Sequence, residues 1–567
     1  MIRIKVSRWL FLAVIPILLF TVPNNVKALD FELGKGITLD VDTTITYGAA
    51  WRTEGQDKDG LKDILTDDGN RNFDQGDMIN NRWSIIADID LHKGDYGFFM
   101  RPKAFFDFAY DGSNANDSPG TNNSSYQNGG DTDYDEFHED TQSAHRDKAE
   151  ILDFFAYGNH SFGNTDVMFR VGRQAVNWGE SLFVMGGISG ATAYLDTTNA
   201  NVPGVEIREL LMPSEQVYFE ISKSDFTLAA FYQWKWDKHR LDESGSYFSV
   251  ADELDSAGER ILVSVAPGIN ATIDRVGDDS AKDSGQWGVA LRYVAKALNY
   301  TEFGLYFVNY HEKMPIMIGN LGYGGWDSPT KAALGGSWAN LPVAPGVSLG
   351  DIDSVTAATL NAVDMSSYYL KYAENVKLIG ASVSGVIGET NVAGEVSYRY
   401  DIPICFKAPN SLLGFIPEKS QYIQGQISTI TILPAGLFYE GLSIFTEIGV
   451  LHICDNTDLV KGYDRTSCGG VFKFVFDYFQ IMQDLDLKVP VTFEINPSGT
   501  SPTAGLFDMY SNTGSFDEDC DSVALGLDFT YKAVYKLSMA YKAYLHGGEK
   551  NKKADRDFLS LNLKYTF

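Results

Sequence analysis

The stretch FLSLNLKYTF, residues 558–567, decides the fold class. Its residues alternate strictly between two sets: the apolar Leu559, Leu561, Leu563, Tyr565 and Phe567, and the polar Ser560, Asn562, Lys564 and Thr566. Alternation with a period of two is typical of a β-strand with one apolar and one polar face. What remains to be decided is whether the apolar face meets a protein core or lipid.

The same alternation recurs along the chain, at 37–51, 99–110, 392–400, 523–531 and 535–545. These runs are longer than the usual globular strand of about 5 to 6 residues. They match the length of about 9 to 11 residues that a tilted strand needs to cross hydrocarbon. Several apolar faces end in Tyr, Trp or Phe, as the aromatic girdles of membrane barrels do.

Connections between the runs alternate in length. Those at 92–95 and 388–391 are tight, whereas 53–80, 237–284 and 312–375 are long. Short periplasmic turns opposite long extracellular loops are typical of outer-membrane barrels. We therefore predict an all-β protein, a transmembrane antiparallel β-barrel of about 16–18 strands with long extracellular loops. The alternative is a secreted soluble β-protein such as a β-helix.

The N-terminus has the three parts of a secretory signal peptide. Arg3, Lys5 and Arg8 precede an apolar stretch at 9–22, and small residues lead to a cleavage site after Ala28. The predicted division is a signal peptide at 1–28 and an outer-membrane barrel at 29–567. The alternative is a membrane anchor, but Pro16 interrupts the stretch and it is short for a span of about 20 residues.

The charge of the chain argues against nucleic-acid binding. The first 28 residues hold four of the 46 Lys and Arg and none of the 75 Asp and Glu, which leaves a mature net charge of −33. A nucleic-acid binder is expected to be basic. The predicted partners are instead outer-membrane lipid and lipopolysaccharide, the barrel assembly machinery of a Gram-negative bacterium, and periplasmic and inner-membrane export proteins. No cofactor is predicted.

Four segments carry a family resemblance: FRVGRQAVNWGESLF at 169–183, the stretches 202–254 and 377–403, and LDLKVPVTFEINPSGTSPT at 485–503. In this order they resemble the Gram-negative outer-membrane family catalogued as domain of unknown function 1302. The most specific parts are the GRQ…WGES and VAGEVSYR runs. The resemblance implies an outer-membrane barrel and a connection with export or catabolism of lipids and hydrophobic compounds.

Polar and charged residues on the inward strand faces are candidates for the lining of a pore. The set comprises Arg101, Lys103, Arg170, Gln174, Arg292, Glu395 and Arg399. A barrel of this size encloses an aqueous channel unless something fills it, and charges that face the lumen tune which solutes pass. The alternative is an internal ladder of salt bridges that stiffens the barrel.

The segment at 178–213 is long, and it is rich in glycine and partly apolar. This composition is unfavourable for a solvated loop. We predict that this segment folds into the lumen as a constriction or plug. Its predicted functional residues, with the end of the preceding strand, are Arg173, Trp178, Glu180, Glu206 and Arg208. The alternative is a loop packed over the barrel rim.

The chain has 4 cysteines. Cys454 and Cys468 flank a polar loop, and we predict a disulfide between them in an oxidising compartment. The four do not form a CxxC motif, so neither a zinc nor a redox site is expected.

The acidic stretch at 131–142 begins like a calcium-binding loop, with Asp131, Asp133 and Asp135 at the first spacings. Glu136 and Gln142 then stand where glycine and glutamate are required. No metal site is predicted there, and the stretch is interpreted as a solvated acidic loop.

No catalytic constellation is recognisable, so the protein is not predicted to be an enzyme. Ser348 lies in a GVSLG sequence, but in a Pro-rich loop rather than between a strand and a helix. The predicted function is an outer-membrane channel that passes or exports a small hydrophobic or amphipathic compound. The alternatives are a general diffusion porin for hydrophilic solutes and a non-transporting structural or adhesive surface barrel.

Overall fold

The computed structural model describes residues 29–58, 60–266, 269–320, 366–407, 415–455, 458–460, 462–501, 516–545 and 551–567. The predicted signal peptide and Ser348 lie outside these residues. The signal peptide therefore stays a prediction.

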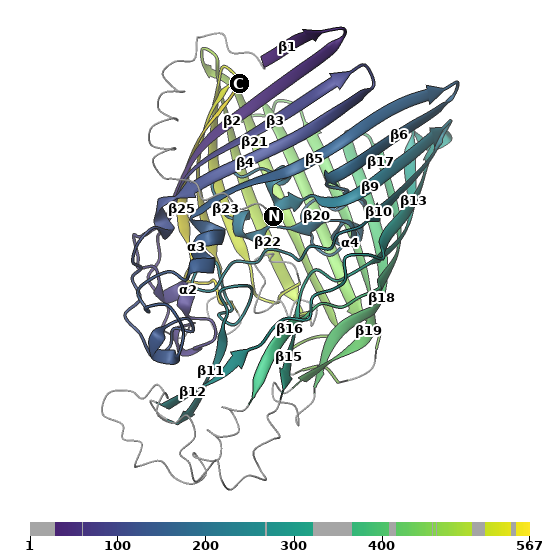
Figure 1. Ribbon diagram of the computed structural model, residues 1–567. Helices are drawn as coiled ribbons and strands as arrows, with labels where there is room; N and C mark the ends of the chain where they lie inside the picture. Colours follow the sequence, from purple (N-terminus) through teal and green to yellow (C-terminus); the bar gives the residue numbers. More distant parts are fainter. Residues whose placement is uncertain are drawn as a thin grey trace.

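An antiparallel ring of 18 strands forms the body of the protein (Figure 1). Each strand pairs with its neighbours in the chain, and β2 pairs with β25 to close the ring, with Arg52 opposite Phe558 and Thr44 opposite Thr566. The barrel predicted from the sequence is confirmed, with the larger of the two expected strand numbers.

The ring consists of β2 (Ile37–Arg52), β3 (Met78–Lys93), β4 (Tyr96–Asp107), β5 (Asp147–Phe162), β6 (Thr165–Gln174), β9 (Ser214–Lys223), β10 (Phe226–Gln233), β13 (Gln286–Ala295), β14 (Thr301–Tyr310), β17 (Val376–Ile387), β18 (Thr390–Lys407), β19 (Phe415–Leu433), β20 (Gly441–Ile453), β21 (Thr466–Met482), β22 (Leu485–Ser498), β23 (Ser522–Tyr531), β24 (Tyr535–Tyr544) and β25 (Phe558–Thr566). A further strand, β1 (Leu29–Gly34), pairs with β2 alone. It pairs with residues 37–41 of β2, beside the part of the same edge, residues 44–52, that pairs with β25.

The alternation at the C-terminus has its expected meaning. Leu559 and Leu563 of β25 are 41% and 49% exposed on the outside, whereas Asn562 is 3% exposed and faces the lumen. Outward apolar residues recur around the ring, as in β14, β17 and β19. Soluble proteins rarely expose so continuous an apolar surface, whereas lipid covers it without cost.

Short turns join the strands at the end of the barrel that holds the C-terminus (Figure 1). Gly94 between β3 and β4, and Gly388 between β17 and β18, have φ of 57° and 63°, a backbone conformation that glycine adopts without strain. The last residue, Phe567, exchanges backbone hydrogen bonds with Thr43 of β2 at 2.7 and 2.9 Å. The chain end is thus held as part of the sheet.

At the opposite end, long connections pack into a structure that we call the loop cap, defined as residues 53–77, 108–146, 234–259 and 551–557 in their described parts. It contains the short helices α2 (Asp68–Arg71) and α3 (Glu139–His145). Buried Arg52 ties two of these loops together: its guanidinium donates to the carbonyls of Asn70 and Phe73 at 3.0 and 2.7 Å and to Asp555 Oδ2 at 3.1 Å.

Four further strands, β11 (Arg260–Ala266), β12 (Ile269–Arg275), β15 (Ile316–Asn320) and β16 (Ser367–Lys371), make a separate small sheet beside the loop cap (Figure 1). Among the described residues, no helix is long and apolar enough to cross a membrane.

A charge on the outer face should destabilise the barrel in lipid. Leu305 lies in the middle of β14 and is 60% exposed on the outside. We expect Leu305→Arg to lower the free energy of unfolding by about 2–4 kcal/mol, since a cation at mid-membrane depth loses its hydration. Urea titration in lipid vesicles measures this. Leu305→Ala, which adds no charge, is the control, and equal losses in both variants would contradict a lipid-facing Leu305.

Candidate functional site: a segment across the lumen

Residues 175–213, which we call the inner segment, leave the wall at the end of β6 and return to it at the start of β9. The segment carries α4 (Ile188–Thr192), the two-residue strands β7 (Tyr194–Leu195) and β8 (Leu211–Met212), and α5 (Ile207–Leu210). Gln174 and Gln216 close its base, because each side-chain amide donates to the backbone carbonyl of the other, at 3.1 and 2.8 Å. Both glutamines are fully buried.

Glu447, a fully buried glutamate of β20, holds the first part of the inner segment. Its carboxylate accepts three consecutive backbone N–H groups: those of Leu182 at 3.1 Å, Phe183 at 2.5 Å and Val184 at 2.6 Å. A carboxylate bound by several amides makes strong charge-assisted hydrogen bonds. The segment thus meets the wall through its main chain rather than through complementary side-chain charges.

Glu395 of β18 binds the main chain of the inner segment in the same way. Its two carboxylate oxygens accept the backbone N–H groups of Glu180 at 2.6 Å and Ile188 at 2.8 Å. Arg399, on the same inward face of β18, donates to the carbonyl of Gly187 at 2.6 Å. Together with Glu447, these side chains fix residues 180–188 against β18 and β20.

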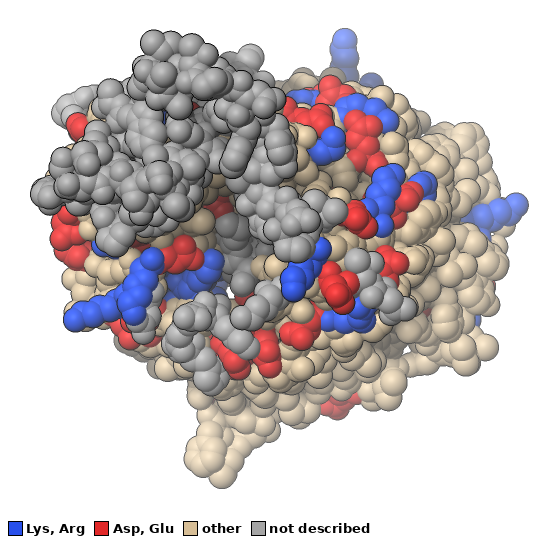
Figure 2. All heavy atoms as spheres, turned by 90° about the horizontal axis from the view of Figure 1, so that it is seen from below, with Lys and Arg blue, Asp and Glu red and all other residues tan. Residues whose placement is uncertain are grey.

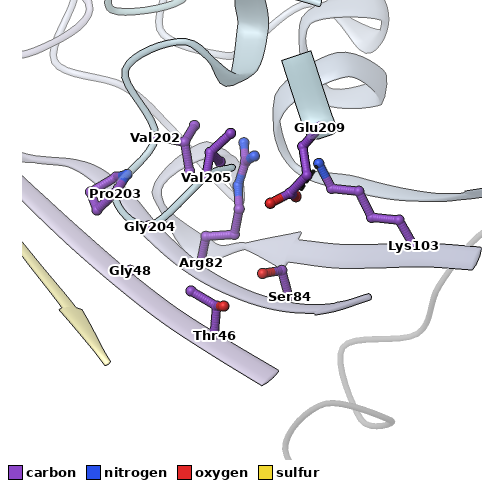
Figure 3. Close-up of a pocket in the computed structure, with 10 residues that line it drawn as sticks. All are labelled: Thr46, Gly48, Arg82, Ser84, Lys103, Val202, Pro203, Gly204, Val205 and Glu209. Atoms are coloured by element: carbon purple, nitrogen blue, oxygen red, sulfur yellow. Dashed lines mark ion pairs between the residues drawn. The ribbon is translucent and has the colours of Figure 1, made fainter. Parts of the chain in front are cut away.

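The later part of the inner segment contacts the wall through charged side chains instead (Figure 3). Three ion pairs join it to the wall: Glu209 with Lys103 at 2.8 Å, Arg208 with Asp88 at 2.6 Å, and Glu206 with Lys564 at 2.5 Å. The wall partners lie on β4, β3 and β25. These are buried or half-buried pairs, which solvent screens less than surface pairs.

The two sets of contacts lie on opposite walls. Following the pairing around the 18-strand ring, β18 is ten strands from β2 in one direction and eight in the other. A segment anchored on β18 and β20 at one end, and on β25, β3 and β4 at the other, therefore crosses the lumen.

A small cavity lies between the inner segment and the β2–β4 wall (Figure 3). Its volume is about 10 Å³, and it is lined from the wall by Arg82, Ser84 and Lys103 and from the segment by Val202, Gly204 and Glu209. A space of ~10–15 Å³ holds about one water molecule. At this point the segment is packed against the wall almost without gaps.

The inner wall differs in chemistry around the ring. On β14, β17, β18, β19 and β20 buried polar residues such as Glu395, Gln424 and Glu447 alternate with apolar ones. The apolar ones form one cluster with Trp178, Val184 and Ile188 of the inner segment: Tyr306, Val308, Tyr310, Val376, Leu378, Ile402, Ile404, Phe406, Tyr422, Leu451 and Ile453. On the opposite wall the inward side chains include Arg82, Lys103, Lys542, Glu494 and Lys564. The lumen is therefore amphipathic in cross-section.

All seven residues predicted to line a pore face the interior, but in different roles. Arg101 binds Asp88 and Asp153, each at 2.6 Å, and so joins β4 to its neighbours β3 and β5. Arg292 of β13 binds Glu220 of β9 at 2.8 Å, across the intervening β10. Lys103, Glu395 and Arg399 bind the inner segment as described above, and Gln174 closes its base.

Arg170 differs from the others. Its guanidinium lies over the ring of Tyr218, 4.8 Å from the centroid, and 5.8 Å from that of Phe155. Among the described residues its Nε has no hydrogen-bond partner. Arg101 and Arg292 thus make ion pairs of the kind that the alternative interpretation requires, and the pore-lining role of the set stays a prediction.

The predicted residues of the inner segment lie at its contacts. Trp178 packs on Phe231, with ring centroids 5.1 Å apart, and Glu180 Oε1 accepts from Ser382 Oγ at 3.5 Å. Arg173, at the end of β6, donates to Tyr194 Oη at 3.1 Å. Glu206 and Arg208 make the ion pairs given above. Four of these residues lie on the inner segment and Arg173 lies on β6, and the five are spread along the segment's length rather than gathered at one point.

Cys454 and Cys468 do not form the predicted disulfide, and all four cysteines are free thiols. Cys468 lies opposite Val450 in the β20–β21 pairing, and Cys454 is four residues beyond Val450. At about 3.3 Å per residue this offset separates the two by ~13 Å along the hairpin, whereas a disulfide requires Cα atoms within ~7 Å.

Sequence reasoning missed Glu447 and Lys313. The sequence signal for Glu447 is that it is the one acidic residue in a strand made mostly of apolar residues. Lys313 follows β14 and is only 1% exposed, and its Nζ donates to the carbonyl of Ala191 at 3.1 Å. Burial lowers the pKa of Lys313 to about 8; Glu312 acts against this shift and Arg399 adds to it.

A family model described as "Protein of unknown function (DUF1302)" matches residues 9–567. The chain belongs to the DUF1302 family. This confirms the resemblance found in the sequence. None of the curated proteins matches the chain.

Solved structures that resemble this DUF1302 protein include OccAB2 of Acinetobacter baumannii, at 11% identity and a TM-score of 0.40, covering 93% of this chain and 98% of that one. Another is a BenF-like porin from Pseudomonas fluorescens, at 9% identity and a TM-score of 0.39, covering 94% and 99%. A third is the outer-membrane channel DcaP of A. baumannii, at 9% and 0.35, covering 95% and 99%.

Removing the charge of Glu447 should loosen the inner segment. Glu447→Gln keeps the side-chain shape but faces three N–H donors with a neutral amide, and each buried donor left unpaired costs about 1–3 kcal/mol. We expect higher single-channel conductance in planar bilayers and faster proteolysis within 181–188. Glu494→Gln is the matched control, since Glu494 faces the lumen but binds Lys542 of the wall at 3.3 Å. The same conductance in both variants would contradict the role of Glu447.

Lys313 should make the stability of this DUF1302 protein depend on alkaline pH. Between about pH 8 and the ordinary lysine value of 10.5, the unfolded chain keeps a proton that the folded chain has lost. The free energy of unfolding therefore rises with pH in this window. Lys313→Met lacks this titration, so the stability of wild type relative to Lys313→Met should rise from pH 8 to 10.5. Urea titrations at both ends of the window measure it, and a constant difference would contradict the buried lysine.

Proposed function

We propose that this protein is an outer-membrane channel through which a small amphipathic or hydrophobic compound passes or is exported, with the inner segment as its constriction. The observation that carries the proposal is the inner segment itself, which crosses the lumen between an apolar wall and a charged wall. A solute at this constriction would have apolar side chains on one side and ion-paired groups on the other.

The apolar wall distinguishes this proposal from a general diffusion channel for hydrophilic solutes. Val308, Leu378 and Ile453 face inward, are fully buried and belong to the same apolar cluster as Trp178 and Ile188. A purely aqueous pore has no need of such a lining, because the interior of a water-filled barrel is polar. A shift of the inner segment would uncover this apolar cluster together with Glu395 and Glu447, which bind the main chain of the segment.

One observation favours a different candidate, a barrel that does not transport. Arg101, Lys103 and Arg292 are all in ion pairs, as an internal ladder of salt bridges would require. A structural or adhesive protein would then act through the loop cap, whose rim carries both acidic and basic residues (Figure 2).

Location and partners are part of the proposal. The outward apolar residues support a site in the outer membrane of a Gram-negative bacterium, among lipid and lipopolysaccharide. An outer-membrane barrel would be assembled by the barrel assembly machinery during biogenesis. Energy for export would come from a solute gradient or from periplasmic and inner-membrane partners.

The test is flux from proteoliposomes that contain the purified barrel. Efflux of an amphipathic dye should exceed that of a hydrophilic sugar of similar size, and replacing residues 179–190 by a short Gly-Ser linker should raise both and reduce the difference. Preferential passage of the sugar in wild type would favour the diffusion porin. No flux of either solute, before or after the replacement, would favour the structural barrel.

A further inference from the structure

Three buried carboxylates meet inside the loop cap, away from the lumen. Asp67 and Asp68 lie at the start of α2 in the loop after β2, and Asp252 lies 184 positions further along, in the loop after β10. Their exposed fractions are 0%, 1% and 0%. One oxygen of each lies within 4.8 Å of the others.

Each carboxylate uses one oxygen and leaves the other without a partner. Asp67 Oδ2 accepts from Arg71 Nε at 2.5 Å, Asp68 Oδ2 accepts from the Asn123 backbone N–H at 2.9 Å, and Asp252 Oδ2 accepts from the Asp68 backbone N–H at 3.1 Å. The Oδ1 atoms of all three are buried and have no hydrogen-bond partner. Three unpartnered acceptors in one buried place are a costly arrangement for a protein interior.

The cationic side chain bound to this group does not balance it. Arg71 is shared with Ser118 Oγ and the Leu61 carbonyl, both at 2.9 Å, and it contacts only Asp67 among the three acids. Buried charges in proteins are paired or bind metal ions. A second buried guanidinium, that of Arg556, interacts electrostatically with Asp252, but it donates to the backbone carbonyls of Tyr247 and Ser249. Two guanidiniums against three carboxylates still leave a deficit of positive charge.

The geometry fits a single calcium ion. Oxygens bound to one Ca²⁺ at about 2.3–2.6 Å are at most about 4.6–5.2 Å apart, and the three acids meet this limit. An all-oxygen site suits a hard cation rather than a transition metal. Asn123 is a further source of oxygen, because its fully buried side-chain amide has no partner and its backbone already contacts Asp68.

We propose that Asp67, Asp68 and Asp252 bind one Ca²⁺, and that the ion fastens the loop after β2 to the loop after β10 over the mouth of the barrel. The site is separate from the inner segment and does not depend on which solute passes. It is also separate from the Asp131, His138 and Glu259 group, where His138 Nε2 lies 3.3 Å from Asp131 and 3.5 Å from Glu259.

The competing explanation is that the acids are protonated. Burial raises the pKa of Asp67 to about 6, and it raises those of Asp68 and Asp252 well above the ordinary range. Neutral carboxyls would need no ion. The two explanations predict opposite results when calcium is added near neutral pH.

The test uses the full-length barrel refolded in detergent, free of lipopolysaccharide, which itself binds calcium. After dialysis against a chelator, CaCl₂ is titrated in by calorimetry near neutral pH. We expect one Ca²⁺ per chain, weakened at least tenfold in Asp252→Asn and unchanged in the control Asp131→Asn, whose carboxylate is 73% exposed. Calcium should also slow hydrogen exchange of residues 61–72 and 249–256 in wild type.

The wild-type titration decides the case even if Asp252→Asn does not fold. No calcium bound by wild type, or an equal affinity in wild type and folded Asp252→Asn, would overturn the proposal and favour protonated acids. Loss of binding in Asp131→Asn alone would move the site to the other acidic group and overturn it as well.

Discussion

The need to pair every backbone N–H and C=O group in the water-free hydrocarbon core of the membrane governs this structure. Each unpaired N–H or C=O in the hydrocarbon core costs several kcal/mol, so a sheet can cross only if it has no free edge there. The pairing of β2 with β25 meets this requirement. Once the ring is closed, every strand has one face toward lipid, and its charged residues are forced onto the other.

The contents of the lumen follow from this sorting. Charges that cannot face lipid must be satisfied inside, and the barrel does so in two ways. In some places the barrel wall pairs its own charges, as Arg101 does with Asp88 and Arg292 with Glu220. Elsewhere the inner segment supplies the partners: Glu395 and Glu447 take its main-chain amides, and Lys103 takes its Glu209. Charged groups of the wall and polar groups of the inner segment thus serve as hydrogen-bond and ion-pair partners for each other.

The sequence predicted the fold because alternation is a local property. A period of two assigns Glu395 and Arg399 to the inward face without any knowledge of the strands around them. The composition of 178–213 likewise indicated an inward segment. The partners of that segment were out of reach, because the strands that face each other across the lumen depend on the strand number and on closure of the ring.

Register and sequence distance explain the other differences. Cys454 and Cys468 are near each other in sequence and flank one loop, but an offset of four residues in the hairpin keeps them apart. Asp68 and Asp252 are 184 residues apart and yet in contact, because two loops fold over the same mouth. Glu447 lies in a largely apolar strand, and its role in binding the main chain of residues 182–184 follows only from the position of the inner segment.

The paired glutamines at the base of the inner segment have one more consequence. Gln174 and Gln216 lie on β6 and β9, which are hydrogen-bonded neighbours in continuous register. The wall is therefore continuous without the segment, which joins it covalently at one seam although it contacts both sides of the lumen. The length or chemistry of such an insertion can change without altering the pairing of the strands around it, so selection can act on the insertion and on the cylinder separately.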